Sequence, residues 1–244
     1  MKEKLFSRWK SRNVPFCNIA VGIFAIVFAY TMNAKADWAP DFKPGTPYNF
    51  GPSALVPKWS EVKAGEWTFN YEGALTKAKA EGKYISVDPN LRKPLWNQEA
   101  DAKEAIEWSL RQADIVKISD EEIEFLWGMT PEAGAQKLLN EYGVSLVYAT
   151  LGPKGCHAAT KKVRVTVDSP KGIRVVDTTG AGDIFGGSAM SRLLKLNKKP
   201  DELTEDELRD IVSFACTAAS LSTQKHGGIS SVPEEDEVLR MVGK

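Results

Sequence analysis

The chain has 244 residues, 43% of them hydrophobic, so it can bury a sizeable core in one or two domains. Lys and Arg together number 32, as do Asp and Glu, and this balance gives no reason to expect a nucleic-acid partner. The three cysteines form no Cys-x-x-Cys pair or even-numbered disulfide framework, and two histidines are too few for a histidine-rich metal site.

Residues 1–36 differ from the rest of the chain. Five Lys and Arg side chains up to Arg12 precede an apolar run over 19–29, and Ala34-Lys35-Ala36 follows. These are the parts of a secretory signal peptide, with cleavage expected after Ala36. An uncleaved membrane anchor is the alternative, although the run is short for a spanning helix. Membrane association is expected only through this segment.

Residues 37–70 are predicted to be an extended leader or linker, because five prolines between positions 40 and 57 block helix formation. From residue 71 onward, helical and strand patterns alternate. The predicted helices cover 71–81, 98–112, a segment capped by Ser119 or Asp120, Thr130 to Gly143, 184–196, and Thr204 to about Thr223. The predicted strands cover 84–88, 115–118, 144–150, 163–167 at a sheet edge, and 173–176. This alternation predicts an α/β layered domain with a mostly parallel sheet.

The most informative stretch is VVDTTGAGDIFGG, residues 175–187, in which a glycine-rich turn opens an apolar helix. Glycines let backbone N–H groups converge, and a helix N-terminus adds partial positive charge, so this turn can hold an anion. Asp183, in the first helical turn, could take the proton of an attacking hydroxyl. The alternative is an ordinary turn in which Asp183 only caps the helix.

The full run resembles the C-terminal signature of the ribokinase-like (PfkB) carbohydrate kinases, and the chain contains no Walker A sequence. The resemblance implies that Asp183 activates the sugar hydroxyl as the catalytic base. It implies that the backbone amides of Gly180, Ala181 and Gly182 form an anion hole for the γ-phosphate of ATP. The implied fold is a three-layer ribokinase-like α/β fold with a parallel sheet.

This fold is expected to be incomplete at its N-terminal side. Nothing in residues 1–70 resembles the family's first strands, its Gly-Gly sugar-binding motif or its small β-sheet lid. The resemblance therefore covers residues 71–244 as the C-terminal part of a sugar kinase domain. Because a lid shields phosphoryl transfer from water, its loss should impair catalysis even with Asp183 present.

Two further motifs follow the family's order. Residues 88–96, DPNLRKPLW, resemble the D-x-N-x-R-x-x-L-W run of the fructokinase and 2-keto-3-deoxygluconate kinase branch. At the end of a strand, Arg92 is expected to bind substrate or phosphate. A surface salt bridge is the alternative role for Arg92. Residues 117–122, KISDEE, resemble the N-x-x-E motif, with Ser119 at the nucleotide-binding position and Glu122 acting on Mg²⁺ through water. An ordinary first-turn acid is the alternative for Glu122.

Two segments resemble the family's nucleotide side. In residues 150–156, TLGPKGC, the resemblance places Thr150, Gly152 and Gly155 at the nucleotide, while the same residues taken alone predict a hairpin turn. Residues 214–233 resemble the adenine-side helix and loop, where Cys216 replaces a frequent Asn. The resemblance implies that backbone carbonyls of this loop and of the DTTGAGD turn hold a monovalent cation, K⁺, at the positions of Asp177, Thr179, Ser222, Lys225, Gly227 and Ser231.

Together these motifs imply ATP-dependent phosphorylation of a sugar hydroxyl, with fructose on its 6-hydroxyl as the expected substrate. ATP and Mg²⁺ are the implied cofactors, K⁺ is a further candidate, and a homodimer stays open. This chemistry belongs in the cytoplasm, whereas residues 1–36 favour export. One alternative is an inactive nucleotide-binding remnant. Another is an exported thioredoxin-like protein, because residues 67–84 faintly resemble the start of such a domain. A fusion, a truncation or an assembly artefact would each explain why an exported leader is joined to the C-terminal part of a kinase.

Overall fold

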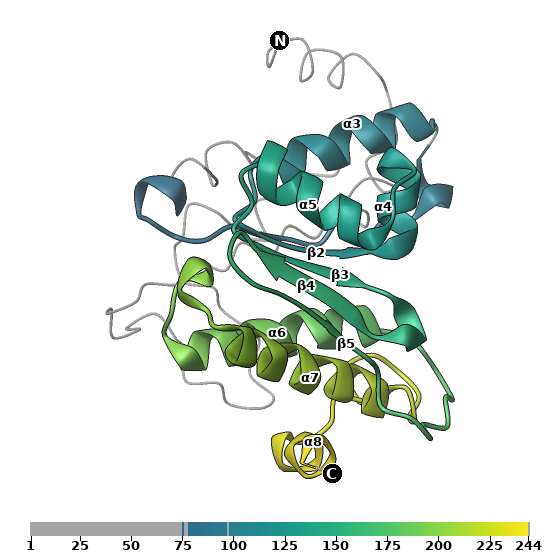
Figure 1. The fold of residues 1–244 in the computed structure, drawn as a ribbon. Helices are drawn as coiled ribbons and strands as arrows, with labels where there is room; N and C mark the ends of the chain where they lie inside the picture. The colour runs from purple at the N-terminus through teal and green to yellow at the C-terminus, as the bar shows by residue number, and fades with distance from the viewer. Residues whose placement is uncertain (1–74, 76–77, 97, 244) are drawn as a thin grey trace, which may run out of the picture. The chain divides into compact units, whose positions relative to one another are not determined.

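The computed structural model describes residues 75, 78–96 and 98–243 (Figure 1). Predictions for the signal-like segment, the linker and the first part of the thioredoxin-like stretch lie outside the described residues. Residues 75 and 78–80 are helical, in agreement with the helix predicted over 71–81. All named strands and helices belong to the compact unit that contains residues 86–243. None of the described helices is long and apolar enough to span a membrane.

A mixed five-stranded sheet forms the middle layer of this unit, with its strands in chain order (Figure 1). The strands are β1 (Ser86–Val87), β2 (Ile115–Ser119), β3 (Leu146–Thr150), β4 (Cys156–Thr160) and β5 (Arg164–Val167). Pairing is parallel from β1 to β3 and antiparallel from β3 to β5. The sheet is therefore less parallel than expected, because a short turn joins β3 to β4 and only a longer crossover can make consecutive strands parallel.

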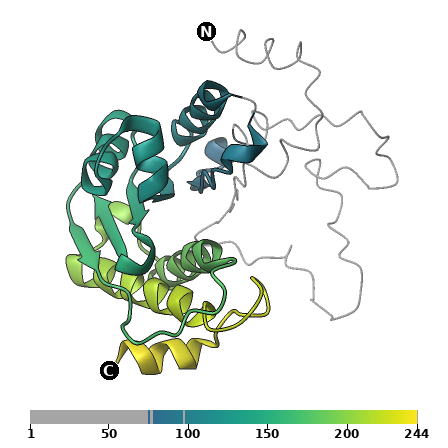
Figure 2. The ribbon, with the colours of Figure 1, turned by 90° about the vertical axis from the view of Figure 1, so that its right-hand side faces the viewer.

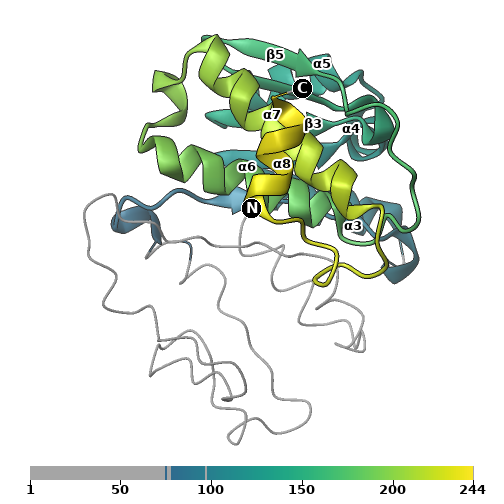
Figure 3. The same cartoon turned by 90° about the horizontal axis from the view of Figure 1, so that it is seen from below.

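Helices cover both faces of the sheet and complete the predicted three-layer α/β architecture (Figures 1 and 2). One face carries α3 (Glu99–Leu110), α4 (Asp120–Trp127) and α5 (Pro131–Glu141). The other carries α6 (Ala181–Leu196) and α7 (Glu205–Ser222), and α8 (Glu235–Val242) packs on α7 (Figure 3). Short 3-10 turns occupy Lys93–Leu95, Gly152–Lys154 and Pro200–Glu202.

The predicted helix caps are present. Thr130 Oγ1 accepts a hydrogen bond from the N–H of Ala133, and reciprocal capping boxes join Thr204 to Glu207 and Ser119 to Glu122. Such caps satisfy N–H groups that have no partner inside the helix. The apolar face of α3 is buried, at Ala102, Ala105, Ile106 and Leu110.

The strand predicted over 173–176 is wrong. The segment is irregular, with Val175 60% exposed and Val176 44% exposed. The backbone N–H and carbonyl groups of a strand form hydrogen bonds with a neighbouring strand. Here the N–H groups of Val176 and Asp177 instead both donate to the carbonyl of Thr223, after the end of α7. The same segment therefore ties the glycine-rich turn to the loop that follows α7.

Candidate active site

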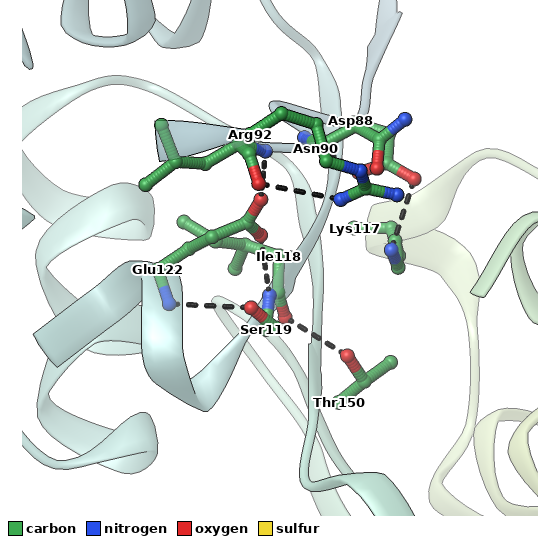
Figure 4. Close-up of polar contacts among 9 residues, drawn as sticks. Asp88, Asn90, Arg92, Lys117, Ile118, Ser119, Glu122 and Thr150 are labelled. Atoms are coloured by element: carbon green, nitrogen blue, oxygen red, sulfur yellow. Dashed lines mark hydrogen bonds and ion pairs between the residues drawn. The ribbon is translucent and has the colours of Figure 1, made fainter. Parts of the chain in front are cut away.

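Polar residues gather where the three parallel strands end. Asp88 directly follows β1, Ser119 ends β2, and Thr150 ends β3 beside Ser119 in the strand register. Thr150 Oγ1 donates to the carbonyl of Ile118 at 3.4 Å (Figure 4). In open α/β sheets, ligands bind at the carboxyl ends of the strands, so this edge is the candidate site.

The glycine-rich turn presents unpaired backbone donors. Gly180 has φ +79° and precedes α6, and a Cβ there would come within 2.9 Å of the Gly228 backbone, so glycine is required. Within the described part of the chain, the N–H groups of Gly180, Gly182 and Asp183 have no hydrogen-bond acceptor. The predicted role of the Ala181 amide is not supported, because its N–H donates to the carbonyl of Thr178 at 3.2 Å. Such donors at a helix N-terminus form an anion-binding site.

Asp183 lies exposed in the first turn of α6. The cap position belongs to Gly180, and no side-chain cap bond is made at this helix start. The structure therefore gives no support to the alternative in which Asp183 serves only as a cap. Asp183 shares the first turn of α6 with the anion-binding N–H groups, and its carboxylate acts electrostatically on Asp88, so it belongs to the part of the chain where a general base for a phosphoryl acceptor would be needed.

Lys117 is a site residue that the sequence analysis did not single out. Its Nζ lies 2.9 Å from Asp88 Oδ2 (Figure 4). The same atom lies 3.0 Å from the place where a Cβ on Gly182 would stand. The side chains of Lys117 and Asp88 are only 14% and 19% exposed. Burial raises the pKa of Asp88 above 3.8, against the opposing effect of Lys117, and the carboxylates of Glu122 and Asp183 raise it further. The ammonium therefore lies between this carboxylate and the anion-binding turn.

Glu122 is buried and uses both carboxylate oxygens. Oε2 accepts the N–H of Ser119 at 2.8 Å, and Oε1 accepts the N–H of Leu91 at 2.7 Å (Figure 4). The first contact completes the capping box of α4 and agrees with the alternative for Glu122, an ordinary acid in the first turn of a helix. The second holds the loop that carries Arg92, in which Asn90 has φ +45° and its N–H donates to Asp88 Oδ1 at 3.1 Å.

Arg92 is exposed on this loop, at the edge formed by the strand ends. Its Nη1 donates to the carbonyl of Leu91 at 3.2 Å, and it forms no ion pair with any other described residue. The salt-bridge alternative is therefore not observed, and the guanidinium remains free to bind an anionic or hydroxyl-rich ligand.

On the predicted nucleotide side, residues 150–156 form the β3–β4 hairpin, so the hairpin prediction is confirmed. The N–H of Leu151 donates to the carbonyl of Gly155 at 2.8 Å, and both glycines of the turn, Gly152 and Gly155, have positive φ. Cys156 and Cys216 are buried, and burial raises the pKa of Cys216 to about 12. Both residues therefore belong to the core as neutral thiols.

The structure brings the candidate cation ligands of two segments together. Asp177 Oδ2 accepts the N–H of Gly227, and Oδ1 accepts the N–H of Thr179, each at 2.9 Å. These hydrogen bonds lower the pKa of Asp177 to about 2, and the bond from Gly227 has the largest effect. The Asp177 carboxylate is therefore ionised at neutral pH. Ser231 Oγ donates to the carbonyl of Gly228 at 3.0 Å. The N–H of Lys225 donates to the carbonyl of Ser222 at 3.2 Å.

The ionised carboxylate of Asp177 and the backbone carbonyls of these two segments are suitable ligands for a hard monovalent cation. The hydrogen bonds from Gly227 and Thr179 orient the carboxylate. For Mg²⁺, the Glu122 oxygens each keep capacity for a further hydrogen bond and fit contact through water, as Mg²⁺ keeps several of its own waters. Among the described residues, no group of three or more His, Cys, Asp or Glu side chains forms a metal cluster.

The fold and the site define an α/β protein with an anion-binding turn and an adjacent carboxylate. The model of the pfkB family carbohydrate kinases matches residues 58–235. The chain is 36% identical over 173 residues to fructokinase-2 of Solanum lycopersicum, and 38% identical over 173 residues to fructokinase-1 of Zea mays. These alignments cover 69% and 70% of this chain, and 51% and 52% of the relatives. The chain belongs to the pfkB family of carbohydrate kinases.

Solved structures give the same result. A fructokinase from Vibrio cholerae O395, bound to fructose, ADP and a potassium ion, matches with a TM-score of 0.61 and 31% identity, over 70% of this chain and 54% of that one. A putative ribokinase II from E. coli, in complex with ATP and Mg²⁺, matches with a TM-score of 0.60 and 26% identity, over 70% and 52%. The chain thus spans about half the length of the relatives it matches.

Proposed function

We propose that this kinase transfers the γ-phosphoryl group of ATP to a sugar hydroxyl, with the 6-hydroxyl of fructose as acceptor. The observation that carries the proposal is the pair of unpaired N–H groups of Gly182 and Asp183 at the start of α6, where the Lys117 ammonium lies against Gly182. Phosphoryl transfer depends mostly on positioning the reactants and on stabilising the negative charge that is spread over the oxygens of the transferring group. N–H donors and an ammonium can supply that stabilisation. The fructokinase relatives support fructose as the acceptor.

In this proposal, the backbone N–H groups at the start of α6 hold the transferring phosphoryl group, and Lys117 neutralises part of its charge. Asp183 accepts the proton of the attacking sugar hydroxyl as the new phosphate ester forms, and ADP leaves. Mg²⁺, when bound, neutralises phosphate charge, and Glu122 would hold it through water. Arg92 would contact the sugar from the edge of the sheet.

The nucleotide is assigned to the face between the β3–β4 hairpin and the loop after α7. The residues proposed to contact it are Ser119, Thr150, Gly152 and Gly155, whereas Cys216, at the position expected on the adenine side, is buried in the core. K⁺ is proposed beside Asp177, whose ionised carboxylate favours a cation. We infer a cytoplasmic site of action, because ATP and Mg²⁺ are supplied there.

The product identifies the reaction. The full chain is incubated with ATP, Mg²⁺ and K⁺ and with fructose, ribose or 2-keto-3-deoxygluconate in separate reactions, and phosphate esters are assigned by ³¹P NMR. Fructose 6-phosphate is the expected product, formed faster than either other ester. ATP consumption without any sugar ester, or no ATP consumption at all, would contradict the proposal.

Replacing Lys117 by Met should lower kcat/KM by about 100-fold, because one charged donor to the developing transition-state charge is lost. Steady-state kinetics with varied ATP measures this change. Lys137→Met is the matched control, since Lys137 also pairs with a carboxylate, Glu141, but within α5. The role of Lys117 is refuted if both variants lose the same amount of activity.

A further inference from the structure

We propose that Asp88 is a positioning residue of the phosphoryl-transfer site, which fixes the Lys117 ammonium against the turn at Gly182. The inference rests on the proposed function and adds a residue to it. Asp88 itself acts through Lys117, because the lysine is the group that lies against the anion-binding turn.

The geometry restricts Lys117 to one orientation. β1 and β2 are parallel, so Asp88, one residue past the end of β1, lies next to Lys117 on β2. Both side chains are mostly buried, and their contact at 2.9 Å is a charge-assisted hydrogen bond (Figure 4). An ammonium on a flexible four-carbon stem needs such a partner to stay at one point.

The charged groups around Asp88 explain why its carboxylate matters. Lys117 approaches it from β2, and the carboxylates of Glu122 on α4 and Asp183 on α6 act on it through space. Both oxygens of Glu122 already accept backbone N–H groups. If Asp88 lost its charge, Asp183, whose carboxylate accepts no hydrogen bond from a described residue, would attract the ammonium more than Glu122 does. Lys117 would then leave the phosphate and pair with the catalytic base.

One substitution separates this role from a merely structural one. Asp88 Oδ1 accepts the N–H of Asn90 and shapes the loop, whereas Oδ2 accepts Lys117. Asp88→Asn keeps an oxygen for the Asn90 contact and removes the charge that holds the ammonium. Asp88→Ala removes both contacts and shows the added cost of losing the loop shape.

Kinetics of the full chain test the proposal. Asp88→Asn should lower kcat by about 10- to 100-fold, as expected for a displaced catalytic group, with the KM for ATP unchanged or lower. The double variant Asp88→Asn/Lys117→Met should be no slower than Lys117→Met alone, because Asp88 acts only through Lys117. Fully additive losses, or a raised KM for ATP with unchanged kcat, would overturn the proposal.

A second readout does not depend on turnover. Acylation of lysines, followed by mass spectrometry, should modify Lys117 several-fold faster in Asp88→Asn than in the wild type, while Lys137 reacts at the same rate in both. Unchanged reactivity of Lys117 would overturn the role of Asp88. Absence of phosphorylation by the wild type would instead contradict the proposed function, so the two failures are distinguishable.

Discussion

Asp183→Asn is expected to lower kcat for fructose phosphorylation by about 10²- to 10⁴-fold, the usual contribution of general base catalysis. The amide cannot accept the proton of the sugar hydroxyl, while the backbone N–H groups that bind phosphate are unchanged. ATP affinity, measured by calorimetry, should therefore stay close to the wild-type value. Initial rates in an assay that couples ADP release to NADH oxidation give kcat.

Asp206→Asn is the matched control, because Asp206 is also an exposed acid in the first turn of a helix, α7. It should leave kcat unchanged. Wild-type kcat in Asp183→Asn would contradict the assignment of the base, and a loss of ATP affinity equal to the loss of kcat would make Asp183 a binding residue instead.

Gly155→Ala is expected to destabilise the protein by about 2–5 kcal/mol, the sum of a strained backbone conformation and an overpacked contact. Gly155 has φ +107°, and a Cβ there would stand 1.9 Å from the carbonyl oxygen of Val167. That oxygen belongs to the backbone of β5, so it cannot move without disturbing the sheet edge. Urea unfolding followed by circular dichroism measures the free energy of unfolding.

Gly172→Ala provides the control for backbone strain alone. Gly172 has φ +78°, but no atom lies within 4 Å of a Cβ built there, so the cost should be about 1 kcal/mol. Equal destabilisation of the two variants would show that the contact with Val167 does not limit residue 155.

Features encoded locally could be predicted from the sequence. The caps at Ser119, Thr130 and Thr204 depend on side chains three residues from the N–H groups they concern, so a short motif is enough. The strand predicted over 173–176 was wrong because a strand also needs a partner, which its apolar residues do not specify. β4 was not predicted as a strand, since its sequence, CHAAT, is rich in small residues with low strand propensity.

In the candidate site, too, the residues of one local motif could be predicted, and those that only the fold brings together could not. The glycine-rich turn and Asp183 occupy one continuous stretch, and the motif indicated both. Lys117 and Asp88 are 29 residues apart, and Leu91 and Glu122 are 31 apart, so only the pairing of parallel strands brings them together. The one local signal for Lys117 was a charged residue within an apolar strand, IVKIS, which indicates a partner without identifying it.

In the proposed reaction, the turn at the start of α6 holds the γ-phosphate of the nucleotide. Backbone amide NMR of the full chain tests it most directly, with ATP and ADP added separately to ¹⁵N-labelled protein in the presence of Mg²⁺. The amide signals of Gly180, Gly182 and Asp183 should shift strongly with ATP and much less with ADP, which lacks the γ-phosphate. Equal shifts with both nucleotides, or no shift with ATP, would show that this turn does not hold the γ-phosphate.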